Sequence, residues 1–234
     1  MTLLQANEKR WNEVKINPSR LDTFQHVAAR LTQSSAKARY QAVEKRTGVP
    51  WWFIAVVHER EASQNWNANI AQGDPYNRVS VHVPRGRGPF QSWEDAAVDA
   101  LVNCPPYAAR NTDWSPAGAL TMLEKYNGLG YAAKGLPSPY IWAGTNQYRS
   151  GKYVRDGVYD PNVVDTQLGC AGLLIAMKVF SSTPHEHVAA GTVVTGGVVA
   201  ASQYPHYAIY IIPAVVIAAI GLFLLIKYFK GKQT

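Results

Sequence analysis

The chain of 234 residues is long enough for one domain of about 150–200 residues and an appendage. Lysine and arginine outnumber aspartate and glutamate by 23 to 16, which suits simple solubility or an anionic partner such as a cell wall, lipid head groups or nucleic acid. Two cysteines, Cys104 and Cys170, exclude a disulfide-rich scaffold and form either one disulfide or two separate buried thiols.

Helical signals dominate the first 180 residues, and the opening residues lack the apolar stretch of a secretory signal. Capping residues mark the ends of the expected helices. These helices cover residues 19–33 with Ser19 as N-cap, 34–48 ending at Gly48, 49–63 with Pro50 in the first turn, 92–103 with Ser92 as N-cap, 115–128 between Ser115 and Gly128, and 160–180 with Asp160 as N-cap.

One stretch departs from the helical pattern. Residues 69–84 hold a Gly-Asp-Pro turn followed by Val79, Val81 and Val83 in alternation with polar residues. Period-two alternation after a turn is typical of a β-hairpin. The sequence therefore predicts a mainly helical, α+β domain with one small hairpin directly after the apolar helix at 49–63.

The C-terminal part of the sequence predicts a membrane anchor. Residues 207–226 contain no charge, and twenty helical residues span about 30 Å, the hydrocarbon thickness of a bilayer. Three lysines follow directly, so the positive-inside rule places the tail in the cytoplasm and the domain outside. The expected organisation is a domain at 1–186, a flexible linker at 187–206, a transmembrane helix at 207–227 and a basic tail at 228–234.

Two glutamates end the apolar helix at 49–63. Glu59 and Glu61 are about 200° apart around a helix, so their carboxylates point to nearly opposite sides and cannot serve one site together. An apolar setting keeps a carboxylic acid protonated near neutral pH, as the general acid of a glycosidase requires. Asp74 offers the second group that glycoside cleavage needs, although its turn also suits a purely structural aspartate. The alternative interpretation is that both glutamates are solvated residues at the end of the helix. The absence of an HExxH pattern argues against a metal site.

At these positions the chain resembles the bacterial and phage lysozyme-like proteins, which cleave peptidoglycan. The matching segments occur in order between residues 45 and 178: "HEREAS", "QGDPY", "SVHVP", "GPF", "LTMLEKYNGLGY", "LPSPYIWAGTNQYRSGKYVRDGVYDP" and "DTQLGCAGLL". The resemblance implies Glu61 as the catalytic acid, with Asp74 and Ser80 in supporting catalytic roles. Ala62 stands where the family has serine, and Ser80 stands where it has threonine.

The resemblance also implies the substrate and its surroundings. The expected partner is a peptidoglycan glycan strand, with other lysis or virion proteins possible, and neither a nucleic acid nor a cofactor or metal is expected. Residues 138–153 form a loop rich in aromatic and amide side chains, which suits either a glycan groove or a loop that covers the core. The residues expected to bind substrate are His58, Tyr126, Asn127, Tyr140, Trp142, Asn146, Gln147 and Tyr148.

Four functions remain open at the level of sequence. The leading expectation is a membrane-anchored muramidase that acts on the β-1,4 bond between N-acetylmuramic acid and N-acetylglucosamine, facing the periplasm and cell wall or carried in a phage virion. A lytic transglycosylase would cleave the same bond without water. A catalytically inactive wall-binding or virion module is the alternative from another class, as is a pore formed by residues 187–234 alone.

Overall fold

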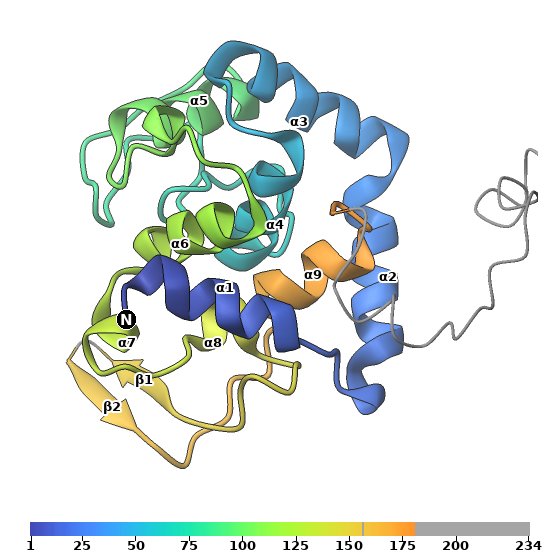
Figure 1. Cartoon of the computed structure of the whole chain (residues 1–234). Coiled ribbons are helices and arrows are strands. Elements are labelled where there is room, and N and C mark those ends of the chain that lie inside the picture. The colour runs from blue at the N-terminus through green and yellow to red at the C-terminus, as the bar shows by residue number, and fades with distance from the viewer. Residues whose placement is uncertain (156, 181–234) are drawn as a thin grey trace, which may run out of the picture. The chain divides into compact units, whose positions relative to one another are not determined.

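The computed structural model describes residues 1–155 and 157–180 of the chain. This part is mainly helical, with a small two-stranded antiparallel sheet, which confirms the coarse fold class expected from the sequence (Figure 1). The α-helices are α1 (Leu3–Glu13), α2 (Leu21–Thr32), α3 (Ser34–Thr47), α4 (Trp51–Ala62), α5 (Trp93–Asn103), α6 (Pro116–Asn127), α7 (Gly130–Ala133), α8 (Pro139–Trp142) and α9 (Cys170–Ala176), with 3-10 turns at Pro18–Arg20 and Ala108–Arg110 and strands β1 (Lys152–Arg155) and β2 (Val158–Asp160).

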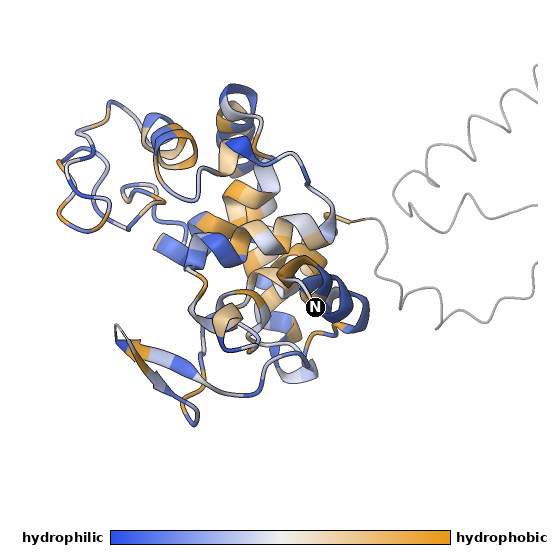
Figure 2. Cartoon of the chain, turned by 60° about the vertical axis from the view of Figure 1, so that its left-hand side comes forward, coloured by the Kyte–Doolittle hydropathy of each residue, from blue (hydrophilic) through white to orange (hydrophobic). Residues whose placement is uncertain are grey.

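Helix α4 is the central core element. Every residue from Phe53 to His58 is buried, and α2, α3 and α9 pack around the helix. Figure 2 shows apolar residues gathered in the helices at the centre of the domain. A helix without a polar face is stable only when it is buried on all sides. The last turn of α4 therefore brings Glu61 from the core to the boundary with solvent.

Most of the predicted helix ends are confirmed. Gly48 closes α3 with a φ of +73°, a conformation that costs glycine little, and Gly128 follows the last residue of α6. Ser92 and Ser115 each accept a backbone N–H from the residue three positions along, as N-caps do. The assignment of Ser19 was wrong, because it lies inside the 3-10 turn that precedes α2.

The predicted hairpin at 69–84 was wrong. This segment contains only an isolated bridge between Ala68 and Pro75, and Val79, Val81 and Val83 are 55%, 66% and 77% exposed. The reason is a local interaction. The Asp74 carboxylate accepts the backbone N–H groups of Val81 and His82, so these groups do not donate to a partner strand. The two-stranded sheet instead lies at residues 152–160, where Tyr153 pairs with Tyr159.

The predicted helix at 160–180 forms only in its second half. Asp160 ends β2 instead of capping a helix, and α9 begins at Cys170. Side chains replace helical hydrogen bonds in between: the Tyr148 hydroxyl accepts the Asp165 N–H at 3.0 Å, and the Asp165 carboxylate accepts the Gln167 N–H at 3.1 Å. The backbone of this connection is thus satisfied without a helical turn.

Cys104 and Cys170 are both buried free thiols, which settles the alternative that the sequence left open. Within residues 1–155 and 157–180, no helix has the length and apolar character needed to cross a bilayer. The predicted linker at 187–206, transmembrane helix at 207–227 and basic tail at 228–234 lie outside the described residues.

Candidate active site

Glu61 lies in the last turn of α4, where protein surrounds most of its side chain but some solvent access remains. The Tyr140 hydroxyl donates a hydrogen bond to Glu61 Oε1 at 2.8 Å. Burial raises the pKa of Glu61 to about 7, and this effect outweighs the hydrogen bond from Tyr140 and the charge of Arg60, which both favour the carboxylate. Glu61 is therefore a carboxylic acid able to hold and release a proton near neutral pH.

A second tyrosine, Tyr126, lies near Glu61. Tyr126 of α6 donates its hydroxyl hydrogen to the carbonyl of Ile70 at 3.1 Å. Burial and the nearby charge of Glu61 raise the pKa of Tyr126 well above its usual value. Helices α4, α6 and α8 and the segment after α4 thus converge on one carboxyl group.

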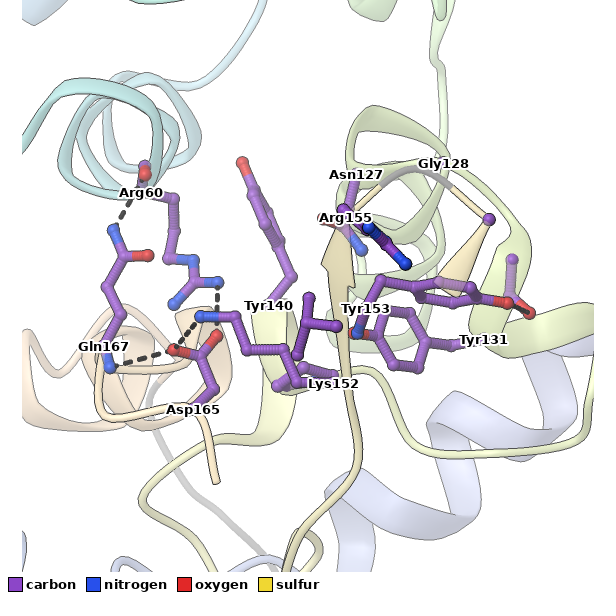
Figure 3. A pocket seen from close by; sticks show the side chains of 14 residues that line it. Arg60, Asn127, Gly128, Tyr131, Tyr140, Lys152, Tyr153, Arg155, Asp165 and Gln167 are labelled. Atoms are coloured by element: carbon purple, nitrogen blue, oxygen red, sulfur yellow. Dashed lines mark hydrogen bonds and ion pairs between the residues drawn. The ribbon is translucent and has the colours of Figure 1, made fainter. Parts of the chain in front are cut away.

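A pocket of about 420 Å³ lies beside Tyr140, the residue that bonds to Glu61 (Figure 3). Glu61 is not among the residues that line the pocket, but Tyr140 lines it and bonds to Glu61. The pocket has an aromatic and basic character, which suits a sugar ring with attached anionic groups. Its lining includes Arg60, Asn127, Tyr131, Tyr140, Lys152, Tyr153, Arg155, Asp165 and Gln167.

Ion pairs fix one wall of this pocket. The carboxylate of Asp165 bonds to Arg60 at 3.3 Å and to Lys152 at 3.2 Å, and the Arg60 guanidinium lies 4.7 Å from the centre of the Tyr140 ring. Burial would raise the pKa of Asp165, but the charge of Arg60 and its hydrogen bonds hold that pKa below the usual value. The side-chain amide of Gln167 donates to the Arg60 carbonyl at 2.8 Å. The wall thus joins α4, β1 and the segment before α9.

The structure gives Asp74 the role of a loop anchor. Its Oδ2 accepts the backbone N–H groups of Val81 at 2.8 Å and His82 at 3.0 Å, and its Oδ1 lies 2.6 Å from His82 Nδ1. These hydrogen bonds, first among them the backbone N–H of His82, lower the pKa of Asp74. Asp74 is buried and ionised, and both of its carboxylate oxygens form hydrogen bonds within the loop.

Ser80 belongs to the same loop and is also buried. Its hydroxyl donates to the Pro84 carbonyl at 2.9 Å and accepts the Arg87 N–H at 2.9 Å. The Ser80 hydroxyl therefore acts as both hydrogen-bond donor and hydrogen-bond acceptor inside the loop. Asp74 and Ser80 are therefore placed together by the structure, but as structural partners of residues 80–87.

His58 and Glu59 lie away from the pocket. His58 is fully buried, with Nδ1 at 3.1 Å from the Tyr40 hydroxyl and Nε2 at 3.0 Å from the Asn65 carbonyl. Burial lowers the pKa of His58 to about 4, so the ring is neutral. Glu59 pairs with Arg30 at 2.8 Å. The two glutamates thus face different environments, in agreement with their helical spacing.

The other predicted binding residues divide into two groups. Asn127 and Tyr140 line the pocket. Trp142 and Tyr148 are buried in the core, and Asn146 accepts the Lys15 N–H at 2.7 Å and donates to the Glu13 carbonyl at 3.0 Å, so it joins the end of α1 to the loop. Gln147 is half-buried, and its backbone N–H donates to the Thr145 hydroxyl at 3.2 Å. The loop at 138–153 is therefore partly a core cover and partly a pocket wall.

Several pocket residues carried no signal in the sequence. Arg60 lies between the two glutamates, and Asp165 and Gln167 fall inside a segment predicted as helix. Lys152 lies on β1, which was predicted as loop, whereas Tyr153 on the same strand belonged to the aromatic loop at 138–153 that was a candidate glycan groove. Their convergence depends on tertiary contacts between α4, β1 and the connection before α9, which no local pattern encodes.

Among residues 1–155 and 157–180, no group of three or more histidine, cysteine, aspartate or glutamate side chains is arranged to hold a metal ion. The chain was compared with protein-family models, with curated proteins and with solved structures. None of the three comparisons finds a match.

Proposed function

We propose that the protein cleaves the β-1,4 glycosidic bond between N-acetylmuramic acid and N-acetylglucosamine in peptidoglycan, with Glu61 as the general acid. The observation that carries this proposal is the environment of Glu61. A carboxyl group with a pKa of about 7, bonded to Tyr140 beside a pocket lined by aromatic and basic residues, has the properties that glycosidic cleavage requires. The resemblance of the ordered sequence segments to lysozyme-like proteins supports the same substrate.

Glu61 acts in its protonated form. It donates its proton to the glycosidic oxygen as the bond to the anomeric carbon breaks, and positive charge develops on the sugar ring. Tyr140 holds Oε1 and thereby orients the carboxyl group, while the carboxylate that remains is stabilised by the same hydrogen bond. The raised pKa matters because a carboxylic acid with an ordinary pKa would have lost its proton at neutral pH.

The pocket supplies recognition in this proposal. Tyr153 offers aromatic surface for a sugar face, and the buried Tyr131 packs against it with ring centres 5.0 Å apart. Asn127 offers an amide for hydrogen bonds to an N-acetyl group, and Lys152 and Arg155 offer positive charge to the carboxylates of the lactyl and peptide substituents. The membrane anchor expected at 207–227 would hold this site close to the wall, as in phage lysis or virion-borne wall penetration.

The decisive experiment compares Glu61→Gln with Glu59→Gln in the full-length protein. Purified murein is incubated with each variant in detergent, and released muropeptides are quantified by chromatography. We expect a loss of activity of about 100-fold or more for Glu61→Gln and near wild-type activity for Glu59→Gln. Equal activity of the two variants would refute the assignment.

The same chromatograms distinguish the two cleavage chemistries. Products that end in reducing N-acetylmuramic acid identify a hydrolase, and products that end in 1,6-anhydro-N-acetylmuramic acid identify a lytic transglycosylase. If wild-type protein releases no product but is retained on murein in a pull-down, the chain is a wall-binding module instead.

A further inference from the structure

Asp74 and His82 form a carboxylate–imidazole pair with a defined direction. Asp74 Oδ1 and His82 Nδ1 are 2.6 Å apart, and an ionised carboxylate only accepts hydrogen bonds. The proton between them therefore belongs to Nδ1, which leaves Nε2 on the other side of the ring as the nitrogen that can accept a proton. The carboxylate is itself held by the backbone N–H groups of Val81 and His82. An oriented imidazole of this kind is how a hydrolase prepares a general base.

The imidazole is accessible to solvent. The His82 side chain is 72% exposed, whereas the Asp74 side chain that orients it is 10% exposed. Arg87, a cation in the same loop, is engaged elsewhere, because its Nε donates to Asp99 at 2.8 Å. The loop therefore fixes one nitrogen of the ring in the protein and leaves the other free to contact water.

The pair is tied to the segment that borders Glu61. A Cβ atom at Gly73, the residue before Asp74, would lie 3.4 Å from the backbone oxygen of Glu61. Asn69 donates its backbone N–H to the Asp74 carbonyl at 2.7 Å. The carbonyl of Ile70, the residue after Asn69, accepts a hydrogen bond from the hydroxyl of Tyr126, which lies near Glu61. The turn at residues 69–74 thus contacts the end of α4 and carries Asp74, whose carboxylate holds His82.

From this arrangement we infer that His82 is the general base that activates water for glycoside hydrolysis, with Asp74 as its positioning residue. His82 Nε2 accepts a proton from water, and the water oxygen bonds to the anomeric carbon. The bond from that carbon to the glycosidic oxygen breaks, and Glu61 gives its proton to the leaving oxygen. The proton on His82 then returns to Glu61 through solvent, so the enzyme is regenerated without any other reactant.

This inference rests on the proposed function and adds two statements to it. It selects hydrolysis over transglycosylation, because a water-activating base has no part in anhydro-ring formation. It also replaces the expected direct role of Asp74 with an indirect one, since both Asp74 oxygens already accept hydrogen bonds within the loop.

The test is chemical rescue of a His82→Ala variant by imidazole. The exposed position leaves room for free imidazole to occupy the place of the missing ring. Full-length wild type, His82→Ala, His26→Ala and Glu61→Gln are assayed for reducing-end muramic acid released from purified murein, with and without imidazole. His26 is an exposed histidine on α2 and provides the matched control.

We expect His82→Ala to lose about 100-fold in rate and to recover at least tenfold with imidazole. His26→Ala should match the wild type in both conditions, and Glu61→Gln should stay inactive with imidazole. Rescue is the readout that a merely structural role of His82 would not produce, because free imidazole cannot restore a loop tether.

Distinct outcomes separate the two proposals. If Glu61→Gln retains activity, the proposed function fails. If Glu61→Gln is inactive but His82→Ala is active or is not rescued by imidazole, only the role of His82 fails. Wild-type products that end in anhydro-muramic acid would likewise overturn the role of His82 and leave Glu61 as the acid.

Discussion

Tyr140 and Glu61 join two elements that are 79 residues apart in sequence through one hydrogen bond of 2.8 Å. Tyr140 belongs to the short helix α8, and Glu61 belongs to the last turn of the core helix α4. The hydroxyl favours the ionised carboxylate, while burial favours the protonated acid. The pKa of Glu61 is therefore set by a balance between these two effects, and each can be changed by mutation.

Tyr140→Phe removes the hydroxyl and keeps the ring. The carboxylate loses a donor, so the pKa of Glu61 should rise above its wild-type value of about 7, and the alkaline limb of the pH–rate profile should move to higher pH. At the pH optimum we expect a loss of about 5- to 10-fold, because the carboxyl group is less well oriented. Initial rates of murein digestion between pH 5 and about 9 provide the measurement. An alkaline limb at the wild-type position would show that Tyr140 does not act on Glu61.

Glu61→Gln should change how stability depends on pH. The unfolded chain ionises near pH 4.5 and the folded protein near 7, so the unfolded state releases the proton first as the pH rises. Wild-type stability should therefore fall between pH 4.5 and 7, by at most about 3 kcal/mol from this group. The variant lacks this loss, so its advantage in thermal unfolding temperature should grow across that window.

The control for this experiment is Glu59→Gln. Glu59 pairs with Arg30, so its replacement should bring no stability advantage at any pH. The buried Glu124, whose pKa burial also raises to about 7, contributes the same slope to every variant and cancels in the difference. A pH-independent difference between Glu61→Gln and wild type would contradict a raised pKa at Glu61.

Helices were predictable where the local sequence decides them. The apolar stretch of α4 and the capping residues Gly48, Ser92 and Ser115 act through neighbours a few positions away. The hairpin prediction failed because Asp74 satisfies backbone donors that alternation alone assigns to a strand partner. The pairing at residues 152–160 has no strong local signal and depends on contacts made by the whole fold.

The candidate site shows the same division. The local sequence indicated that Glu59 and Glu61 cannot serve one site together, and the resemblance to lysozyme-like proteins then selected Glu61. Arg60, Lys152 and Asp165 were not identifiable, since they meet only through tertiary structure. His82 is only one of the polar residues that alternate with Val79, Val81 and Val83 in the sequence, and its bond to Asp74 required the folded loop.

Asp165→Asn should destabilise the protein strongly. The Asp165 and Arg60 side chains are 4% and 6% exposed, so the variant leaves the Arg60 charge buried without its counterion. We expect a loss of about 3–5 kcal/mol in the free energy of unfolding, which urea denaturation followed by circular dichroism measures. Asp22→Asn, at an exposed position of α2, is the matched control and should stay within about 0.5 kcal/mol of wild type. A similar midpoint for the two variants would mean that the Arg60–Asp165 pair does not hold the pocket wall.

His58 should give the protein an acid sensitivity opposite in sign to that of Glu61. Burial lowers the pKa of His58 from 6.5 to about 4, so between these values the unfolded chain binds a proton that the folded protein excludes. His58 therefore makes its full contribution to the free energy of unfolding above pH 6.5. This contribution, up to about 3 kcal/mol, is lost as the pH falls from 6.5 to about 4. His58→Gln cannot titrate and should flatten the fall in unfolding temperature over that range, even if the lost bond to Tyr40 lowers the temperature at every pH. His26→Gln, at an exposed position, should keep the wild-type slope, and an unchanged slope in His58→Gln would show that another group causes the acid sensitivity.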